Sequence, residues 1–147
     1  MNDATDNLLA STLAQDLRAL LGKLKRRLRE QAHSGDLTPS QVSVLLRLEK
    51  DGPATVSQLA RAEAMRPQSM AAVVAALEAL NLVSGAPHPT DGRQTLLSLT
   101  ETCRQQLKEG RAARQDWLTR IIQARLSASE QAELATSVAL LKRLADD

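Results

Sequence analysis

Residues 82–100 read Leu-Val-Ser-Gly-Ala-Pro-His-Pro-Thr-Asp-Gly-Arg-Gln-Thr-Leu-Leu-Ser-Leu-Thr and form the one convincing β-hairpin in a chain whose other patterns are helical. The first two residues predict a short strand, and Leu97 and Leu99 alternate with polar residues as in a second, half-buried strand. The Asp-Gly pair between them indicates a turn, because Gly92 tolerates a positive φ without steric cost. This turn places Arg93 at or beside the tip of the hairpin, where we expect its side chain to point into solvent.

Two short helices precede the hairpin. A capping box at Thr55–Gln58 begins a helix over about residues 56–63. A second helix, over about residues 67–80, begins with a proline at its first position, and Asn81 suits a left-handed stop. Joined by residues 64–66, the two helices form a helix-turn-helix. With an arginine-tipped hairpin behind it, this pattern is typical of a winged helix-turn-helix, which reads the major groove of DNA with its second helix and the minor groove with its wing.

The helix over residues 67–80 has two different faces. One face is apolar and is predicted to lie in the core: Met70, Val73, Val74, Leu77 and Leu80. The opposite face carries small and polar residues: Gln68, Ser69, Ala72, Ala75 and Ala76. In a reading helix, Gln68 pairs with adenine, Ser69 bonds to base edges or a phosphate, and Arg66 reaches a phosphate. Simple solvation of Gln68 and Ser69 is the alternative interpretation.

One more helix belongs to the middle of the chain: it covers about residues 39–50 and begins with a capping box at Thr38–Gln41. The remaining helices lie at the two ends of the chain. A long helix over about residues 7–32 carries a leucine stripe: Leu9, Leu13, Leu17, Leu20, Leu24 and Leu28. Another runs from Thr100 or Glu101 to about residue 126, and a capping box at Ser127–Glu130 begins the last, with its own stripe: Leu134, Val138, Leu141 and Leu144.

The small middle module cannot cover these stripes, so we expect a symmetric dimer built by both termini; a self-contained helical bundle is the alternative. The expected organisation is a single domain over residues 1–147, in which residues 1–36 and 101–147 form the dimerisation region and residues 37–100 the winged helix-turn-helix. The residues expected at the dimer interface are Leu9, Leu13, Leu17, Leu134, Val138, Leu141 and Leu144. The fold class is therefore mainly α with a small β-hairpin wing.

Composition narrows the choice of partner. Hydrophobic residues make up 43% of the 147 residues and aromatic residues only 1%, so the core must consist of aliphatic side chains. Because stacking on aromatic residues is the usual way to hold single strands, we expect double-stranded DNA instead. The net charge of +2 argues against tight binding by phosphate neutralisation alone.

Other classes of function find little support. The single cysteine, Cys103, excludes a disulfide within the chain and suits the cytoplasm, and we expect a packed, inert thiol. No secretory signal pattern and no apolar run long enough for a membrane span appears, and no nucleophile, P-loop, metal-ligand or paired-carboxylate pattern indicates an enzyme or a cofactor.

The chain resembles the MarR family of transcriptional regulators over nearly its whole length. The resemblance rests on Thr55–Ala60, Arg66–Met70, Leu77–Val83, the Asp91-Gly-Arg93 wing and the Leu97-Ser-Leu-Thr100 strand, in the family's order and spacing. It implies a homodimer that binds pseudo-palindromic operators and, in many members, releases DNA when a small effector binds. By position, Arg93 matches the arginine that enters the minor groove, Asp91 the acid that orients it, and residues 67–69 the start of the recognition helix.

The chain also departs from the family's pattern. Ala71-Ala72 stands where related proteins often carry Thr-Arg, and Ser84-Gly85 stands where many have a basic residue. Both departures remove contacts to DNA. No effector site is evident, and Trp117 is a weak candidate, with core packing or a dimer contact as the alternative.

We therefore expect a DNA-binding transcriptional regulator, a repressor more than an activator, that acts as a homodimer and responds to a small-molecule effector. The expected DNA-contacting residues are Arg66, Pro67, Gln68, Ser69, Ala72, Asp91, Gly92 and Arg93. The alternative is a helical protein-interaction module that keeps the winged-helix shape and binds DNA weakly or not at all.

Overall fold

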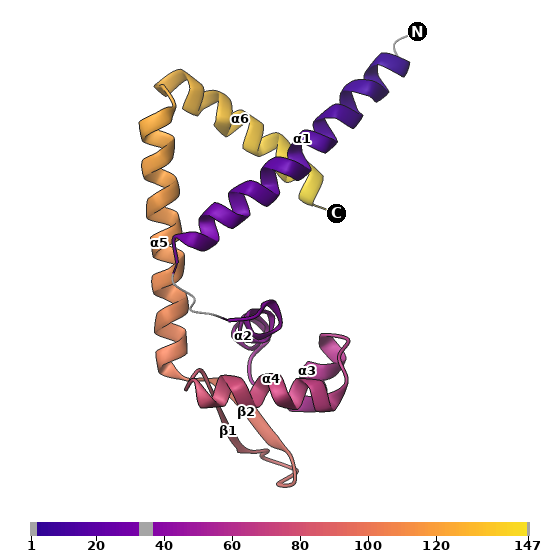
Figure 1. The fold of residues 1–147 in the computed structure, drawn as a ribbon, viewed down its shortest axis with the longest axis vertical. Coiled ribbons are helices and arrows are strands. Elements are labelled where there is room, and N and C mark those ends of the chain that lie inside the picture. Colours follow the sequence, from indigo (N-terminus) through magenta and orange to yellow (C-terminus); the bar gives the residue numbers. More distant parts are fainter. Residues whose placement is uncertain (1–2, 33–36, 147) are drawn as a thin grey trace. The chain divides into compact units, whose positions relative to one another are not determined.

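The computed structural model describes residues 3–32 and 37–146. Helices and strands follow in this order: α1 (Asp3–Glu30), α2 (Pro39–Asp51), α3 (Val56–Ala62), α4 (Pro67–Ala79), β1 (Val83–Pro87), β2 (Thr95–Leu99), α5 (Glu101–Arg125) and α6 (Ala128–Ala145) (Figure 1). This arrangement confirms the predicted fold class, mainly helical with one two-stranded hairpin.

The chain divides into two compact units. The first unit comprises the described residues of Met1–His33 and Arg111–Asp147, and the second those of Ser34–Gly110. Helices α2, α3 and α4 and the hairpin all belong to the second unit, so the predicted reading helix and wing share one body.

Side-chain caps begin three of the helices, as predicted. Thr38, Thr55 and Ser127 each accept a hydrogen bond at 3.2 Å from the backbone N–H three residues on. In each case the side-chain oxygen of the residue at that third position accepts a hydrogen bond of 2.9 Å from the backbone N–H of the N-cap residue. These reciprocal pairs satisfy backbone donors that have no partner within the helix, and they fix where α2, α3 and α6 start.

Both helices of the helix-turn-helix end in a Schellman motif. After α4, Asn81 adopts the predicted left-handed conformation (φ 58°), and the N–H of Leu82 donates to the Leu77 carbonyl at 3.0 Å. After α3, Ala64 takes that role with φ 54°, and the N–H of Met65 donates to the Ala60 carbonyl at 2.8 Å. Glycine is the usual residue at such a position, so Ala64 places a Cβ in a conformation that ordinarily costs free energy.

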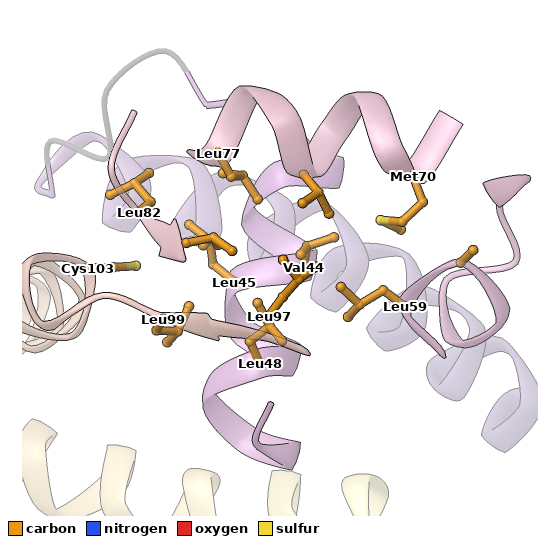
Figure 2. Packing of buried hydrophobic residues seen from close by; sticks show 13 residues of the cluster. Val44, Leu45, Leu48, Leu59, Met70, Leu77, Leu82, Leu97, Leu99 and Cys103 are labelled. Carbon is orange, nitrogen blue, oxygen red and sulfur yellow. The ribbon is translucent and has the colours of Figure 1, made fainter. Parts of the chain in front are cut away.

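The hydrophobic core of the second unit is aliphatic. Figure 2 shows Leu77 and Met70 of α4 directed toward α2, with Leu97 of β2 and Leu59 of α3 closing the cluster. Its buried members are Val44, Leu45, Leu48, Leu59, Ala60, Met70, Val74, Leu77, Leu82, Val83, Leu97, Leu99 and Cys103. The predicted core face of α4 is therefore correct at three of its positions.

Two residues of that face depart from the prediction. Val73 is only partly buried, and Leu80 is 55% exposed, so its assignment to the core was wrong. Leu80 is the C-cap of α4, and at about 100° per residue it lies beside Val73, at the edge of the buried face that Met70, Val74 and Leu77 form. In α2, Val44 is fully buried, whereas Leu46 is exposed.

The hairpin is longer than its sequence pattern indicated. Its antiparallel register pairs Val83 with Leu99 and Pro87 with Thr95, and Leu82 precedes the first strand. A further bridge joins Leu97 to Ala54, through hydrogen bonds of 3.0 and 2.8 Å, and so ties the base of the wing to the segment before α3.

Helices α1 and α6 contain no buried residue in the single chain. Exposed side chains on them include Leu9 (60%) and Leu144 (75%), while Leu17 and Leu134 are half-buried. The sequence His-Ser-Gly-Asp at residues 33–36, which we expect to break the first helix, lies outside the described residues. No helix within 3–32 or 37–146 is long and apolar enough to cross a membrane.

Candidate nucleic-acid interface

The first turn of α4 presents free polar groups to solvent. Arg66 is its N-cap and makes no side-chain capping bond, and Pro67 occupies the first helical position. Gln68 and Ser69 are both exposed, and no hydrogen bond engages either side chain within the described part of the chain. Ala72 and Ala75 are also exposed, so this side of α4 combines two unengaged polar side chains with a surface of methyl groups.

Exposed polar residues at the start of a helix can read base edges when the helix enters a major groove. The first turn of α4 contains no acidic residue, so no carboxylate opposes an approaching phosphate there. The positive end of the helix dipole adds a weak attraction for the same anions.

The wing ends in a loop, His88–Gln94, that is closed by hydrogen bonds. The N–H of His88 donates to the Gln94 carbonyl at 3.0 Å, and the N–H of Gln94 donates to the Asp91 carbonyl at 3.0 Å. Gly92 and Arg93 therefore occupy the two central positions of a β-turn, and the Arg93 side chain is exposed. Figure 1 shows this loop as the free end of the hairpin within its unit.

Two expectations about the turn need correction. Gly92 does not have a positive φ, so the turn does not depend on the conformational freedom of glycine. The carboxylate of Asp91 accepts a bond of 3.2 Å from the backbone N–H of Arg93, and no Asp91–Arg93 ion pair forms among the described residues. Asp91 thus shapes the backbone that carries the guanidinium, because an aspartate beginning a turn bonds readily to the amide two residues on.

Sequence reasoning missed a polar cluster that braces the turn of the helix-turn-helix. Glu63, the C-cap of α3, accepts bonds from the Ser43 hydroxyl at 2.6 Å and from Arg47 Nε at 3.2 Å. The bond from Ser43, together with Arg47, lowers the pKa of Glu63 against the opposing effect of burial. Residues twenty positions apart form this cluster, so no local pattern could have revealed it.

Sequence reasoning also missed His88. Its Nδ1 atom lies 3.2 Å from the backbone nitrogen atoms of both Thr90 and Asp91. A side chain that accepts from the amides two and three residues on resembles the local bonds that asparagine and aspartate make in turns. The only local signal was the position of a polar residue just before the turn.

The other candidates from the sequence lie elsewhere. Trp117 is half-buried in the first unit, with the Arg27 guanidinium carbon 5.0 Å from its ring centroid. Cys103 is buried in the core, and burial raises the pKa of its thiol, as expected for an inert cysteine. Across the two described stretches, no group of three or more His, Cys, Asp and Glu side chains lies close enough to hold a metal ion.

Comparison with known proteins agrees with this geometry. The sequence model of the MarR family matches residues 35–94, which span the helix-turn-helix and most of the wing. An HTH-type transcriptional regulator of Mycobacterium bovis is 39% identical over 135 residues, covering 92% of this chain and 94% of that protein. The repressor MdtR of Bacillus subtilis is 31% identical over 93 residues, covering 63% of this chain and 60% of that protein.

Similarity at the level of structure extends over nearly the whole chain. The crystal structure of a transcriptional regulator protein from Pseudomonas aeruginosa superposes with a TM-score of 0.80 at 37% identity, covering 95% of this chain and 97% of that one. The relationship therefore includes the terminal helices as well as the winged module. The chain belongs to the MarR family of HTH-type, DNA-binding transcriptional regulators.

Proposed function

We propose that the protein binds a pseudo-palindromic operator as a homodimer, with α4 in the major groove and the wing in the adjacent minor groove. The observation that carries this proposal is the pairing, on one compact unit, of the unengaged Gln68 and Ser69 with the exposed Arg93 at the tip of the wing. Arg66 and Ala72 complete the surface of α4, and Pro67, Asp91 and Gly92 shape the backbone at the two contacts.

The surface of the terminal helices supports the proposed dimer. Leu9 and Leu13 of α1 and Val138, Leu141 and Leu144 of α6 are exposed in the single chain. Exposed leucines at helical spacing are typical of a surface that a partner covers. A twofold dimer would place two reading helices on half-sites about 34–36 Å apart, one turn of DNA.

Repression is the regulatory outcome we propose, by similarity to MdtR, whose name identifies it as a repressor. A bound repressor acts by occupying the operator, which requires no further contact from this chain. We place the protein in the cytoplasm, since a buried free thiol suits a reducing compartment. Relief by a small effector is part of the proposal, with the half-buried Trp117 as the candidate lining residue.

The test is binding to the DNA upstream of the protein's own gene, followed by fluorescence polarisation over a salt series. We expect affinity to fall steeply as salt rises, because phosphate contacts release counterions. Arg93→Ala should cost about 1–3 kcal/mol of binding free energy. Arg125→Ala, which removes an exposed arginine from the last turn of α5, is the matched control and should bind like the wild type.

A second candidate function is a protein-interaction module that binds DNA weakly. The alanine surface of α4 at positions 71, 72 and 75 and the net charge of only +2 favour it. Weak binding with no preference for the upstream fragment, unchanged by Arg93→Ala, would support this candidate over the regulator with an operator.

A further inference from the structure

The loop at the tip of the wing is organised by one imidazole ring. His88 Nδ1 lies 3.2 Å from the backbone nitrogen of Thr90 and 3.2 Å from that of Asp91. The Thr90 hydroxyl oxygen lies at the same distance of 3.2 Å from this atom. One side-chain atom therefore holds the chain at the point where it turns toward Arg93.

These contacts assign a role to one ring nitrogen. A backbone N–H can only donate, so Nδ1 is the acceptor for both amides. The two amides share the one lone pair of this atom, and the Thr90 hydroxyl lies beside it.

The contacts continue from His88 to Arg93. Asp91, whose N–H donates to the imidazole, accepts in turn from the Arg93 N–H at 3.2 Å. The Asp91 carbonyl accepts from Gln94, and the Gln94 carbonyl accepts from the N–H of His88, each at 3.0 Å. The loop is thus a closed ring of hydrogen bonds in which Arg93 is anchored through Asp91.

We infer that His88 is a positioning residue for Arg93, and that its imidazole holds in place the loop backbone that carries the wing arginine. The inference rests on the proposed function, since it assigns Arg93 its contact with the operator. An arginine held by an ordered loop loses less conformational freedom on binding than one carried by a mobile loop. Asp91 and Arg93 are the charged residues of the loop, and strands β1 and β2 contain no titratable side chain.

The first test compares three proteins in the same operator-binding assay. His88→Ala removes the acceptor, and we expect affinity to fall by at least about 5-fold, the cost of fixing the backbone of about one loop residue on binding. His88→Asn supplies an amide oxygen that can accept from the same two N–H groups, so we expect it to bind within about 2-fold of the wild type. An asparagine variant as weak as the alanine variant, or an alanine variant equal to the wild type, would overturn the inference.

A double-mutant cycle separates positioning from direct contact. In the Arg93→Ala background, His88→Ala should cause no further loss, because the residue that it positions is absent. If the two losses simply add, His88 acts on DNA by another route and the inference fails.

A measurement on the free protein keeps this test distinct from that of the proposed function. In NMR relaxation measurements, the backbone amides of Thr90, Asp91 and Arg93 should be more mobile in His88→Ala than in the wild type, and as ordered as the wild type in His88→Asn. Amides that are equally ordered in all three proteins would contradict the loop mechanism, whether or not DNA binds. A loop that becomes mobile in His88→Ala, with no operator binding by the wild type, would refute the proposed function instead.

Discussion

Replacing Ala64 by glycine should stabilise the protein. Ala64 is the left-handed residue of the Schellman motif after α3, with φ 54°, and its side chain is exposed. The substitution therefore removes a methyl group that makes little buried contact and relieves the steric conflict between Cβ and the backbone.

The size of the effect follows from two opposing contributions. A residue with a Cβ in the left-handed region costs about 1–2 kcal/mol. Glycine also destabilises the folded state by about 0.5–1 kcal/mol, because it gives the unfolded chain more conformational freedom, and this offsets part of the gain. We therefore expect Ala64→Gly to raise the free energy of unfolding by about 0.5–1 kcal/mol, which for a chain of this size corresponds to a Tm about 1–4 °C higher.

The assay is urea unfolding followed by far-UV circular dichroism, at one protein concentration so that self-association affects all samples equally. Ala75→Gly is the matched control, because Ala75 is an exposed alanine in the interior of α4, where glycine should cost about 1 kcal/mol. Opposite signs for the two substitutions are the expected result. If Ala64→Gly lowers the urea midpoint as Ala75→Gly does, the left-handed conformation of Ala64 carries no strain and the reasoning is wrong.

Three further predictions concern the wing, the turn and the thiol. Gly85→Ala should destabilise the wing, because an added Cβ would lie 2.5 Å from the Thr95 methyl carbon. Gly92→Ala should be neutral or slightly stabilising, since nothing lies within 4 Å of its added Cβ and its φ is not positive. Thermal unfolding of both variants distinguishes them, and equal Tm values would contradict the geometry. Glu63→Gln should destabilise by about 1 kcal/mol at neutral pH and flatten the acid side of the stability profile. The sign follows from the lowered pKa of Glu63: its stabilising contribution is complete above the ordinary value of 4.5 and disappears as pH falls through the lower native value, so urea midpoints that fall equally in both proteins would refute it. Cys103 should react with a thiol reagent only as fast as the protein unfolds, because it is buried in the core and burial raises its pKa; rapid labelling of the native protein would contradict this packing.

Local chemistry explains why the helices could be predicted from the sequence. A capping box consists of two residues three positions apart, so Thr38, Thr55 and Ser127 indicated their helices without any knowledge of the fold. The left-handed stop at Asn81 was equally local. The position of the wing followed from the Asp-Gly pair and the alternating leucines, although its strands proved longer than the pattern indicated.

Features that depend on distant residues could not be predicted in this way. Leu80 lies at the edge of the apolar stripe of α4, and which edge residues the fold covers cannot be read from the stripe; Leu80 is 55% exposed. The Asp-Gly pair indicated a turn in which Gly92 has a positive φ, whereas the hydrogen bonds of the loop hold the turn although the φ of Gly92 is not positive. The bonds from Ser43 and Arg47 to Glu63 join different helices, which only the folded chain brings together.

The same distinction between local and distant interactions applies to the candidate site. The exposure of Gln68, Ser69 and Arg93 follows from helical periodicity and turn position, which are local properties of the sequence. The role of Asp91 needed the structure, because the same carboxylate can bond to a guanidinium or to an amide. The DNA contacts and the dimer interface assigned to these surfaces stay predictions.

The single indole of this protein gives one of its two units an optical signal of its own. Trp117 is the only tryptophan, the chain has no tyrosine or phenylalanine, and the ring lies in the unit of the terminal helices with the Arg27 guanidinium over it. Ultraviolet emission therefore reports the melting of that unit alone, whereas ellipticity reports helices throughout the chain. Recording both on one heated sample will reveal whether the two units unfold together or in sequence, without a label or a truncated chain.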